Sequence, residues 1–401
     1  MMAFLNPTFI SAYLIILLFG CAESEAPNIL KFNEVTNKFA WNLYKEVKQP
    51  SENTILSPIS LQLLLDILLQ GANGTTAAEI ARVLQHEADD KTILNAYKNF
   101  LEDLDHKDKT TEFKTATAIA VDQSFPLSEV DRMNQHLNQY FKTDIKKYDF
   151  KENPKNSSDM INAWVKDHTE GEIETLLPEG SIDSSTEMVM VSGTVFKGEW
   201  KHKFNKKNTV VERFHITRNE SRSVNMMGLT GGRFRYLWNS DHELQIVELP
   251  YKEKEFRMII ILPDNGLAEL ERKFTYEDLS ELINSIKETS VDVFLPRFKI
   301  KKSVDLVNGL KKMGMLTAFS RYADFSKMTN SSISVSKVMQ KAMIVVKEKG
   351  TRAAAGSGIT LTAKALPPQM VCNSPFLYII FKGDTILFIG SFLKPPHKIN
   401  R

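Results

Sequence analysis

Residues 350–368 read Gly-Thr-Arg-Ala-Ala-Ala-Gly-Ser-Gly-Ile-Thr-Leu-Thr-Ala-Lys-Ala-Leu-Pro-Pro, and no other stretch of the chain constrains the fold as strongly. In a strand, successive side chains point to opposite faces. The uncharged face holds small or medium residues: Thr351, Ala353, Ala355, Ser357, Ile359, Leu361 and Ala363. Arg352, the only charge before Lys364, lies on the other face. Such a segment can be an exposed loop in one state and a central strand in another. A flexible linker is the alternative interpretation, because small residues without a helical stripe also form linkers.

The sequence around this segment predicts a mixed α+β domain. Ser57-Pro58 is typical of a helix start, and leucines at helical spacing follow it before Gly71. Further helices are predicted over 76–84, 93–104 and 157–170. Strands are predicted over 188–196, 244–249, 256–262, 291–298, 342–346, 376–381 and 385–393. Helices first and strands later, without regular alternation, favour mostly antiparallel sheets in one domain covering residues 23–401.

The first 22 residues form a separate segment. They contain no Asp, Glu, Lys or Arg, and Phe9–Gly20 is almost wholly apolar. That run is shorter than the roughly 20 residues needed to span a bilayer. It is typical of a signal peptide over 1–22, although no basic residue precedes it, so we expect a secreted, extracellular protein. A buried N-terminal helix and a bacterial lipoprotein signal at Cys21 are the alternatives.

Cysteines and glycosylation motifs agree with export. Cys21 and Cys372 are the only cysteines, and Cys21 would leave with the signal peptide, so no disulfide is possible within the mature chain. Cys372 is expected to be a half-buried structural thiol. Four Asn-x-Ser/Thr motifs, at Asn73, Asn156, Asn219 and Asn330, favour a glycoprotein.

The bulk composition excludes several classes of function. The chain has 401 residues, 42% of them hydrophobic, and a net charge of only +2, which does not indicate nucleic-acid binding. No second apolar run is long enough for a membrane span. We found no nucleophile elbow, zinc-protease motif or phosphate loop, and no metal-spaced cluster among the eight histidines. We therefore expect a soluble monomer that is not an enzyme.

Several motifs together resemble one family. Glu348-Lys349-Gly350-Thr351, followed by Ala353-Ala354-Ala355, resembles the hinge of inhibitory serpins. The further matching motifs, in chain order, are Ser57-Pro58-Ile59-Ser60, Asn162-Ala163-Trp164-Val165, Phe196-Lys197-Gly198-Glu199-Trp200, Glu248-Leu249-Pro250-Tyr251, Leu295-Pro296-Arg297-Phe298, Ala323-Asp324-Phe325-Ser326 and Ser374-Pro375-Phe376-Leu377. The resemblance covers essentially the whole mature chain.

The resemblance implies the serpin fold and a suicide mechanism. A serine protease attacks the reactive-centre loop, about 349–368, and the cleaved loop inserts into the main sheet before water releases the covalent acyl-enzyme. Counting from the hinge Glu348 places the bait bond at Lys364–Ala365. Arg352 and Lys364 are the only basic residues between Gly350 and Phe381, and a Lys before the bond suits a trypsin-like protease. The hinge set is Glu348, Gly350, Thr351, Ala353, Ala354, Ala355 and Ser357.

The chain also departs from the family pattern. The hinge position after Thr351 is usually acidic, and here it is Arg352. The family often has an Asn and a His bonded across the strands that open, and the matching residues are Ser192 and Gln340. A shorter or water-bridged contact is therefore expected there. The residues assigned to sheet opening are Ser57, Ser60, Ser192, Trp200 and Gln340, and Gly193 is expected to add backbone freedom.

Two possibilities stay open at this point. A basic run, Lys197, Lys201, Lys203, Lys206 and Lys207, together with Lys299, Lys301 and Lys302, could bind a heparin-like sulfated glycosaminoglycan. The alternative is ordinary solvated surface, and no cofactor is required for inhibition. A non-inhibitory serpin acting as carrier, chaperone or storage protein is the other possible function.

Overall fold

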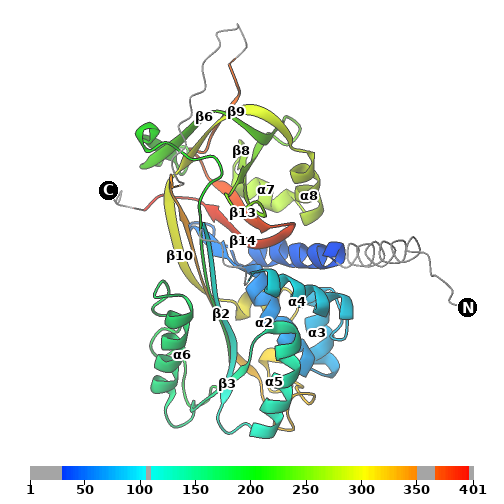
Figure 1. The fold of residues 1–401 in the computed structure, drawn as a ribbon. Coiled ribbons are helices and arrows are strands. Elements are labelled where there is room, and N and C mark those ends of the chain that lie inside the picture. The colour runs from blue at the N-terminus through cyan, green and yellow to red at the C-terminus, as the bar shows by residue number, and fades with distance from the viewer. Residues whose placement is uncertain (1–28, 105–109, 350–365, 397–401) are drawn as a thin grey trace, which may run out of the picture.

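The computed structural model describes residues 29–104, 110–349 and 366–396, and the strands of these residues form two sheets (Figure 1). The helices are one over 29–47, α2 (Pro58–Gly71), α3 (Gly74–Leu84), α4 (Lys91–Leu104), α5 (Leu127–Phe141), α6 (Pro154–His168), α7 (Leu267–Lys273), α8 (Tyr276–Ser285) and α9 (Val307–Lys312), with 3-10 turns η1 (Lys206–Asn208) and η2 (Thr317–Phe319).

The five-stranded sheet has the order β10-β11-β4-β2-β3. Its strands are β10 (Phe298–Asp305), β11 (Val335–Val346), β4 (Met188–Gly198), β2 (Thr111–Asp122) and β3 (Ile145–Tyr148). The pairs β11–β4 and β2–β3 are parallel, whereas β10–β11 and β2–β4 are antiparallel. The central strand, β4, therefore has β11 as a parallel neighbour on one side.

The nine-stranded sheet has the order β1-β14-β13-β8-β7-β6-β9-β12, with β5 also paired to β6. Its strands are β1 (Thr54–Leu56), β5 (Val210–His215), β6 (Ser221–Asn239), β7 (Leu244–Pro250), β8 (Phe256–Pro263), β9 (Lys287–Pro296), β12 (Gln369–Val371), β13 (Phe376–Lys382) and β14 (Thr385–Phe392). Only its β12–β9 pair is parallel, so the predicted mostly antiparallel architecture is confirmed.

Strand β4 is buried on both faces, which explains its continuous apolar sequence. Met190 and Phe196 face the large core between the two sheets and α2. Val191 and Val195 face a second core under α6, which lies against the other face of the five-stranded sheet (Figure 1).

The predicted helices and strands are largely confirmed, with one clear error. The expected strand over 291–298 is two strands, β9 and β10, which belong to different sheets and are separated at Arg297. The long strands β2 and β6 were not predicted. Cys372 is completely buried rather than half-buried, and burial raises the pKa of its thiol.

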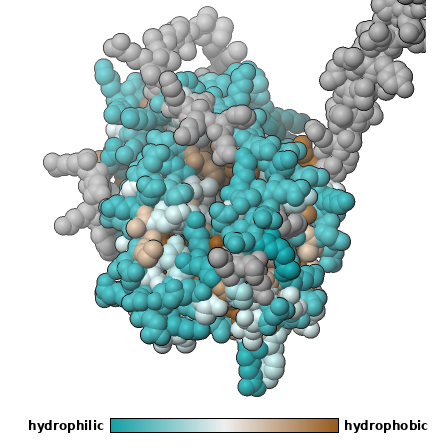
Figure 2. All heavy atoms as spheres, turned by 60° about the horizontal axis from the view of Figure 1, so that its bottom comes forward, coloured by the Kyte–Doolittle hydropathy of each residue, from teal (hydrophilic) through white to brown (hydrophobic). Residues whose placement is uncertain are grey.

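Hydrophilic side chains cover most of the face shown in Figure 2, in which the lower end of Figure 1 is brought forward. Large exposed hydrophobic residues are far apart in the chain: Met160 lies in α6, Val211 in β5, and Tyr322 in the connection after η2. Within the described residues, no helix combines the length and apolar character needed to cross a bilayer.

Candidate functional site

The candidate site is the parallel boundary between β4 and β11, which we call the seam. It runs in register from Met188 beside Val335 to Lys197 beside Val345, with one irregularity near Val335. Because β4 and β11 pair directly, no strand lies between them. A segment continuing from the end of β11 and turning back between them would run antiparallel to both neighbours, in the better hydrogen-bonding arrangement.

A small polar network lies beneath the middle of the seam, where the register places Gln340 beside Ser192. Both side chains are buried and meet the first turn of α2. Gln340 accepts from the Ser57 amide at 2.9 Å and donates to the Ser57 carbonyl at 2.8 Å. It also donates to Ser60 Oγ at 3.2 Å, and Ser60 Oγ lies 2.7 Å from Ser192 Oγ. Ser60 therefore provides the link across the strands that the sequence suggested would be short or water-bridged.

Gly193, on the opposite face of β4, provides space for the neighbouring helix α6. A Cβ at this position would lie 2.8 Å from Val165 Cγ1 of α6 and 3.4 Å from Ile173 Cδ1. The absence of a side chain thus lets α6 pack closely onto the seam. Gly193 does not have a positive φ, so its conformation alone does not require glycine. The added backbone freedom expected there stays a prediction.

The segment after α6, residues 169–177, crosses the seam and is held by contacts to α6 and to the strands beneath it. Asn162 in α6 holds the end of this segment, since its Oδ1 accepts from the amides of Leu176 at 2.8 Å and Leu177 at 2.9 Å.

Lysines of three adjacent strands bind the same segment, 169–177. Lys197 of β4 pairs with Glu172, Lys341 of β11 donates to the Thr175 carbonyl, and Lys301 of β10 donates to the Glu172 carbonyl at 2.6 Å. We call these three residues the lysine clasp. Any strand entering the seam must displace this segment.

After β11 the described chain continues through residues 347–349, where the predicted hinge begins, and we call this described part the hinge from here on. Trp200 holds it: Nε1 donates to the Lys347 carbonyl at 2.9 Å, and the Trp200 amide donates to the Lys349 carbonyl at 3.4 Å. The indole is buried and stacked on Tyr251 at 4.4 Å between ring centroids. Trp200 therefore fixes the hinge, and it lies apart from the serine and glutamine network.

Glu348 is buried in the hinge, with only 5% of its surface exposed. Thr209 donates its hydroxyl to Glu348 Oε1 at 2.9 Å, and the Arg297 guanidinium lies 3.7 Å from the same oxygen. Arg297 lies within the quoted Leu-Pro-Arg-Phe motif, but its pairing with a residue about 50 positions later could not be predicted from spacing alone. The same is true of Thr209, which no motif singled out.

The remaining predicted residues fall in different places. Gly350, Thr351, Ala353, Ala354, Ala355, Ser357, Lys364 and Ala365 lie outside the described residues, as does the expected signal peptide. Asn73, Asn156, Asn219 and Asn330 are all exposed. Of the predicted basic run, Lys197 is paired with Glu112 and Glu172, and Lys206 lines a cavity beside the hinge.

The comparisons with known proteins agree with this geometry. The serpin family model, described as serine protease inhibitor, matches residues 34–395. Human serpin B4 is 33% identical over 389 residues, covering 90% of this chain and 99% of its own. Uncleaved ovalbumin superimposes with a TM-score of 0.84 at 26% identity, covering 90% of this chain and 99% of its own. The highly specific insect serpin Serpin48 of Tenebrio molitor gives a TM-score of 0.81 at 28% identity, covering 92% and 99%.

This chain belongs to the serpin family. Its fold is the serpin fold, as the sequence predicted. Members of the family are generally protease inhibitors rather than catalytic enzymes.

Proposed function

We propose that this serpin is a secreted suicide-substrate inhibitor of a trypsin-like serine protease, with Lys364–Ala365 as the bond offered for cleavage. The observation that carries the proposal is the closed seam. Strands β4 and β11 are paired directly and in parallel, and the chain reaches the hinge straight from the end of β11. A segment cut after Lys364 stays attached to β11 and can enter the seam there.

The length and composition of the segment fit that role. From Thr351 to Lys364 about 14 residues would extend about 46 Å as a strand, at about 3.3 Å per residue. Strands β4 and β11 contain 11 and 12 residues, so the cut segment can pair along the whole seam. Its uncharged face could then replace contacts on the core side without burying a charge.

The test is to mix the purified protein with trypsin, run a denaturing gel and analyse the released C-terminal peptide by mass spectrometry. We expect a stable covalent complex and a peptide that begins at Ala365. Lys364→Glu is the matched variant and should abolish the complex, because trypsin-like enzymes bind a basic side chain before the cut bond. Clean cleavage at Lys364 without a complex would contradict inhibition and favour a substrate-like serpin with a carrier or storage role. If Lys364→Glu formed the complex with trypsin at an unchanged rate, the bond that the protease cuts would be a different one.

Secretion belongs to the same proposal. The apolar 1–22 segment and the four exposed asparagines in glycosylation motifs support it. Expression in a eukaryotic cell should release a protein whose N-terminal sequence starts near residue 23 and whose mass falls after glycosidase treatment. Retention of residues 1–22 in a protein that stays inside the cell would contradict it.

A further inference from the structure

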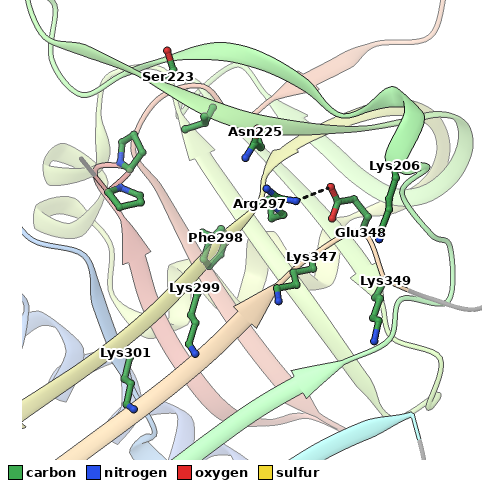
Figure 3. A pocket seen from close by; sticks show the side chains of 13 residues that line it. Lys206, Ser223, Asn225, Arg297, Phe298, Lys299, Lys301, Lys347, Glu348 and Lys349 are labelled. Carbon is green, nitrogen blue, oxygen red and sulfur yellow. Dashed lines mark ion pairs between the residues drawn. The ribbon is translucent and has the colours of Figure 1, made fainter. Parts of the chain in front are cut away.

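The segment that carries the proposed bait bond is joined to the two sheets at ends that lie at different distances from the bond. At one end is the hinge, which the ion pair of Glu348 with Arg297 holds (Figure 3). The last hinge residue, Lys349, lies fifteen residues before Lys364. At the other end, Pro368 lies only four residues after Lys364. A tether of few residues restricts position more than a long one, so the attachment at Pro368 has the greater influence on where the bond lies.

We call residues 366–371, at this nearer end, the stem. Leu366 precedes Pro367, which precedes Pro368, and a residue before proline is restricted to extended conformations. Each proline ring also fixes its own φ near about −65°. At about 3.1 Å per residue, four residues from Pro368 reach about 12 Å. A displacement of the stem is therefore carried to the bond that the protease attacks.

The stem enters the nine-stranded sheet at its edge. Its strand, β12, pairs with β9 over three residues, and it has no second neighbour among the strands of the described ranges. The hydrogen bond at the start of this pairing comes from Asp292 of β9, whose amide donates to the Pro368 carbonyl at 2.9 Å. Strand β6 pairs with the other edge of β9, and both strands lie at the upper end of the molecule in Figure 1.

Strand β6 has a bulge opposite the same aspartate. The β6–β9 register shifts in the middle of β6, so two residues there, Thr230 and Gly231, lie opposite Asp292 alone. Gly231 has a φ of 71°, a left-handed conformation that glycine adopts readily. The extra residue of a bulge is left out of the ladder of main-chain hydrogen bonds. Here the Gly231 amide donates to Asp292 Oδ1 at 2.9 Å instead.

Asp292 therefore holds two neighbouring strands with two different groups. Its amide binds the stem, and its carboxylate binds the bulge. Val291 and Val293, on either side of it in β9, are completely buried, whereas Asp292 is partly exposed. The core thus keeps β9 in the sheet without help from the carboxylate. What the carboxylate adds is a charge-assisted hydrogen bond at the point where β9 receives the stem.

We propose that Asp292 is a positioning residue for the attack on Lys364–Ala365: by holding the Gly231 bulge, its carboxylate fixes the part of β9 to which the stem is bound. This inference rests on the proposed function, because it concerns how the bait bond is presented to the protease. A catalytic serine needs its target carbonyl in a defined position, and a misplacement of about 1 Å can slow a reaction about a hundred-fold.

The position of the stem also predicts which kinetic step depends on Asp292. The stem is C-terminal to the bait bond, so a cut after Lys364 separates it from the segment that would insert, residues 351–364. Loss of the carboxylate should therefore slow the attack. It should leave unchanged the fraction of attacks that end in a stable complex.

Reaction with trypsin tests this separation in the wild type, Asp292→Ala and Asp292→Asn. The rate of attack is the rate at which the peptide beginning at Ala365 appears on denaturing gels. Asp292→Ala should be attacked at least about five-fold more slowly, with no change in the ratio of inhibitor to trypsin needed for complete inhibition. Asp292→Asn keeps an oxygen that accepts from Gly231, so its rate should stay within about two-fold of the wild type. Glu288→Ala, which removes an exposed carboxylate from the same strand, is the matched control and should also stay within about two-fold.

Two further measurements address the bulge itself. Amide hydrogen exchange over residues 229–233 should be at least about ten-fold faster in Asp292→Ala than in the wild type or Asp292→Asn. Equal exchange in all three proteins would show that the carboxylate does not hold the bulge. Gly231→Val perturbs the same contact from β6, because a β-branched residue is strongly disfavoured at a φ of 71°. A Cβ at Gly231 meets no atom within 4 Å, so the strain stays in the bulge, and the attack should slow at least about five-fold.

The outcomes separate this inference from the proposed function. An unchanged rate of attack in Asp292→Ala and Gly231→Val overturns the role of Asp292, as do equal losses in Asp292→Ala and Asp292→Asn. A slower attack combined with a higher ratio of inhibitor to trypsin would mean that Asp292 also acts on insertion, and would overturn the kinetic assignment. If trypsin cuts after Lys364 without forming a complex, inhibition fails as the function, while the rates of cutting still decide the role of Asp292. No cut after Lys364 in the wild type overturns both.

Discussion

The seam between β4 and β11 and the β13–β14 pair are both central and buried, yet they are built from different residues. The middle of the seam contains Ser192, Gly193 and Gln340, bonded to the first turn of α2. Every residue of β13 and β14 is buried, and Phe376 stacks on Phe392 at 5.3 Å between ring centroids. Separating β13 from β14 would expose large aromatic surface, whereas polar groups at the seam can be satisfied by an inserted backbone.

The difference indicates which of the two strand boundaries is suited to opening. The seam is parallel, contains small and polar side chains at its centre, and is covered by a segment held mainly by lysines that are partly or fully exposed. The β13–β14 pair is antiparallel and lies between β8 and β1. Under the proposed function, the seam is the boundary that opens and accepts a strand, and the β13–β14 pair holds the molecule together while that happens. Five predictions test this contrast, ordered by expected effect.

The largest effect is expected from Thr351→Arg. It places a charge on the face of the loop that must enter the seam, and burying an unpaired charge is very costly. Complex formation with trypsin should fall at least about a hundred-fold while cleavage continues, as measured on denaturing gels. Thr360→Arg, on the opposite face of the same alternation, is the control and should keep inhibition. Equal behaviour of the two variants would contradict insertion with this register.

Phe388→Ala tests the boundary that stays closed. Phe388 is completely buried and lies 5.8 Å from the Phe196 ring and 5.9 Å from the Phe113 ring. The cavity and lost burial should reduce the free energy of unfolding by about 3–5 kcal/mol. Denaturant titration of the uncleaved protein measures it, and a loss below about 1 kcal/mol would mean that this boundary is not the rigid one.

These two regions also differ in how far the sequence predicts them. Strands β13 and β14 were predicted almost to the residue, because two short apolar runs joined by the Lys382-Gly383-Asp384 turn favour a buried pair of strands. Strand β6 was not predicted because Gly228, Gly231 and Gly232 interrupt it, although arginines alternate with apolar residues along its second half as in a half-buried strand. The seam residues were predicted only through family resemblance. The Glu348–Arg297 and Thr209 contacts depend on the tertiary fold, which local patterns do not encode.

The buried ion pair of His86 with Asp66 tests how much α2 contributes to stability. Asp66 lies in α2, whose first turn contacts the seam. Burial alone would lower the pKa of His86, but the Asp66 carboxylate at 2.9 Å outweighs it and raises the pKa to about 9. An unfolded His titrates near 6.5, so the pair's contribution is complete below about pH 6.5 and is lost as pH rises through about 9. The unfolding free energy should fall by about 3 kcal/mol over that range, and the fall should be absent in His86→Gln. If the unfolding free energy of the wild type and of His86→Gln changed equally with pH, the stabilising role of the His86–Asp66 pair would be contradicted.

Gln340→Ala tests the polar network under the seam. Removing the amide leaves the Ser57 amide and carbonyl without their partner, which should cost about 1–3 kcal/mol of stability. Because the loss falls on the seam, amide hydrogen exchange should rise in β4 and β11 while β13 and β14 stay protected. Uniformly faster exchange in all four strands would erase the proposed contrast.

The smallest effect is expected from Lys197→Gln in the lysine clasp. Lys197 is partly exposed, and its ion pairs with Glu172 and Glu112 should contribute less than about 1 kcal/mol. Stability should therefore hardly change, whereas the rate of complex formation with trypsin should rise modestly because segment 169–177 is released more easily. A slower rate would mean that the clasp assists insertion. Lys337→Gln, on β11 but outside the clasp, is the control.

The most direct test of seam opening is the thermal unfolding midpoint before and after a single cut between residues 350 and 365. A cut segment that enters the seam adds a central strand with antiparallel pairing on both sides, so circular dichroism should show a midpoint raised by tens of degrees, well beyond the few degrees that about 1 kcal/mol produces. Thr351→Arg cut at the same place should keep the midpoint of the uncut protein. An unchanged midpoint in the wild-type chain would show that the seam stays closed and would contradict the account.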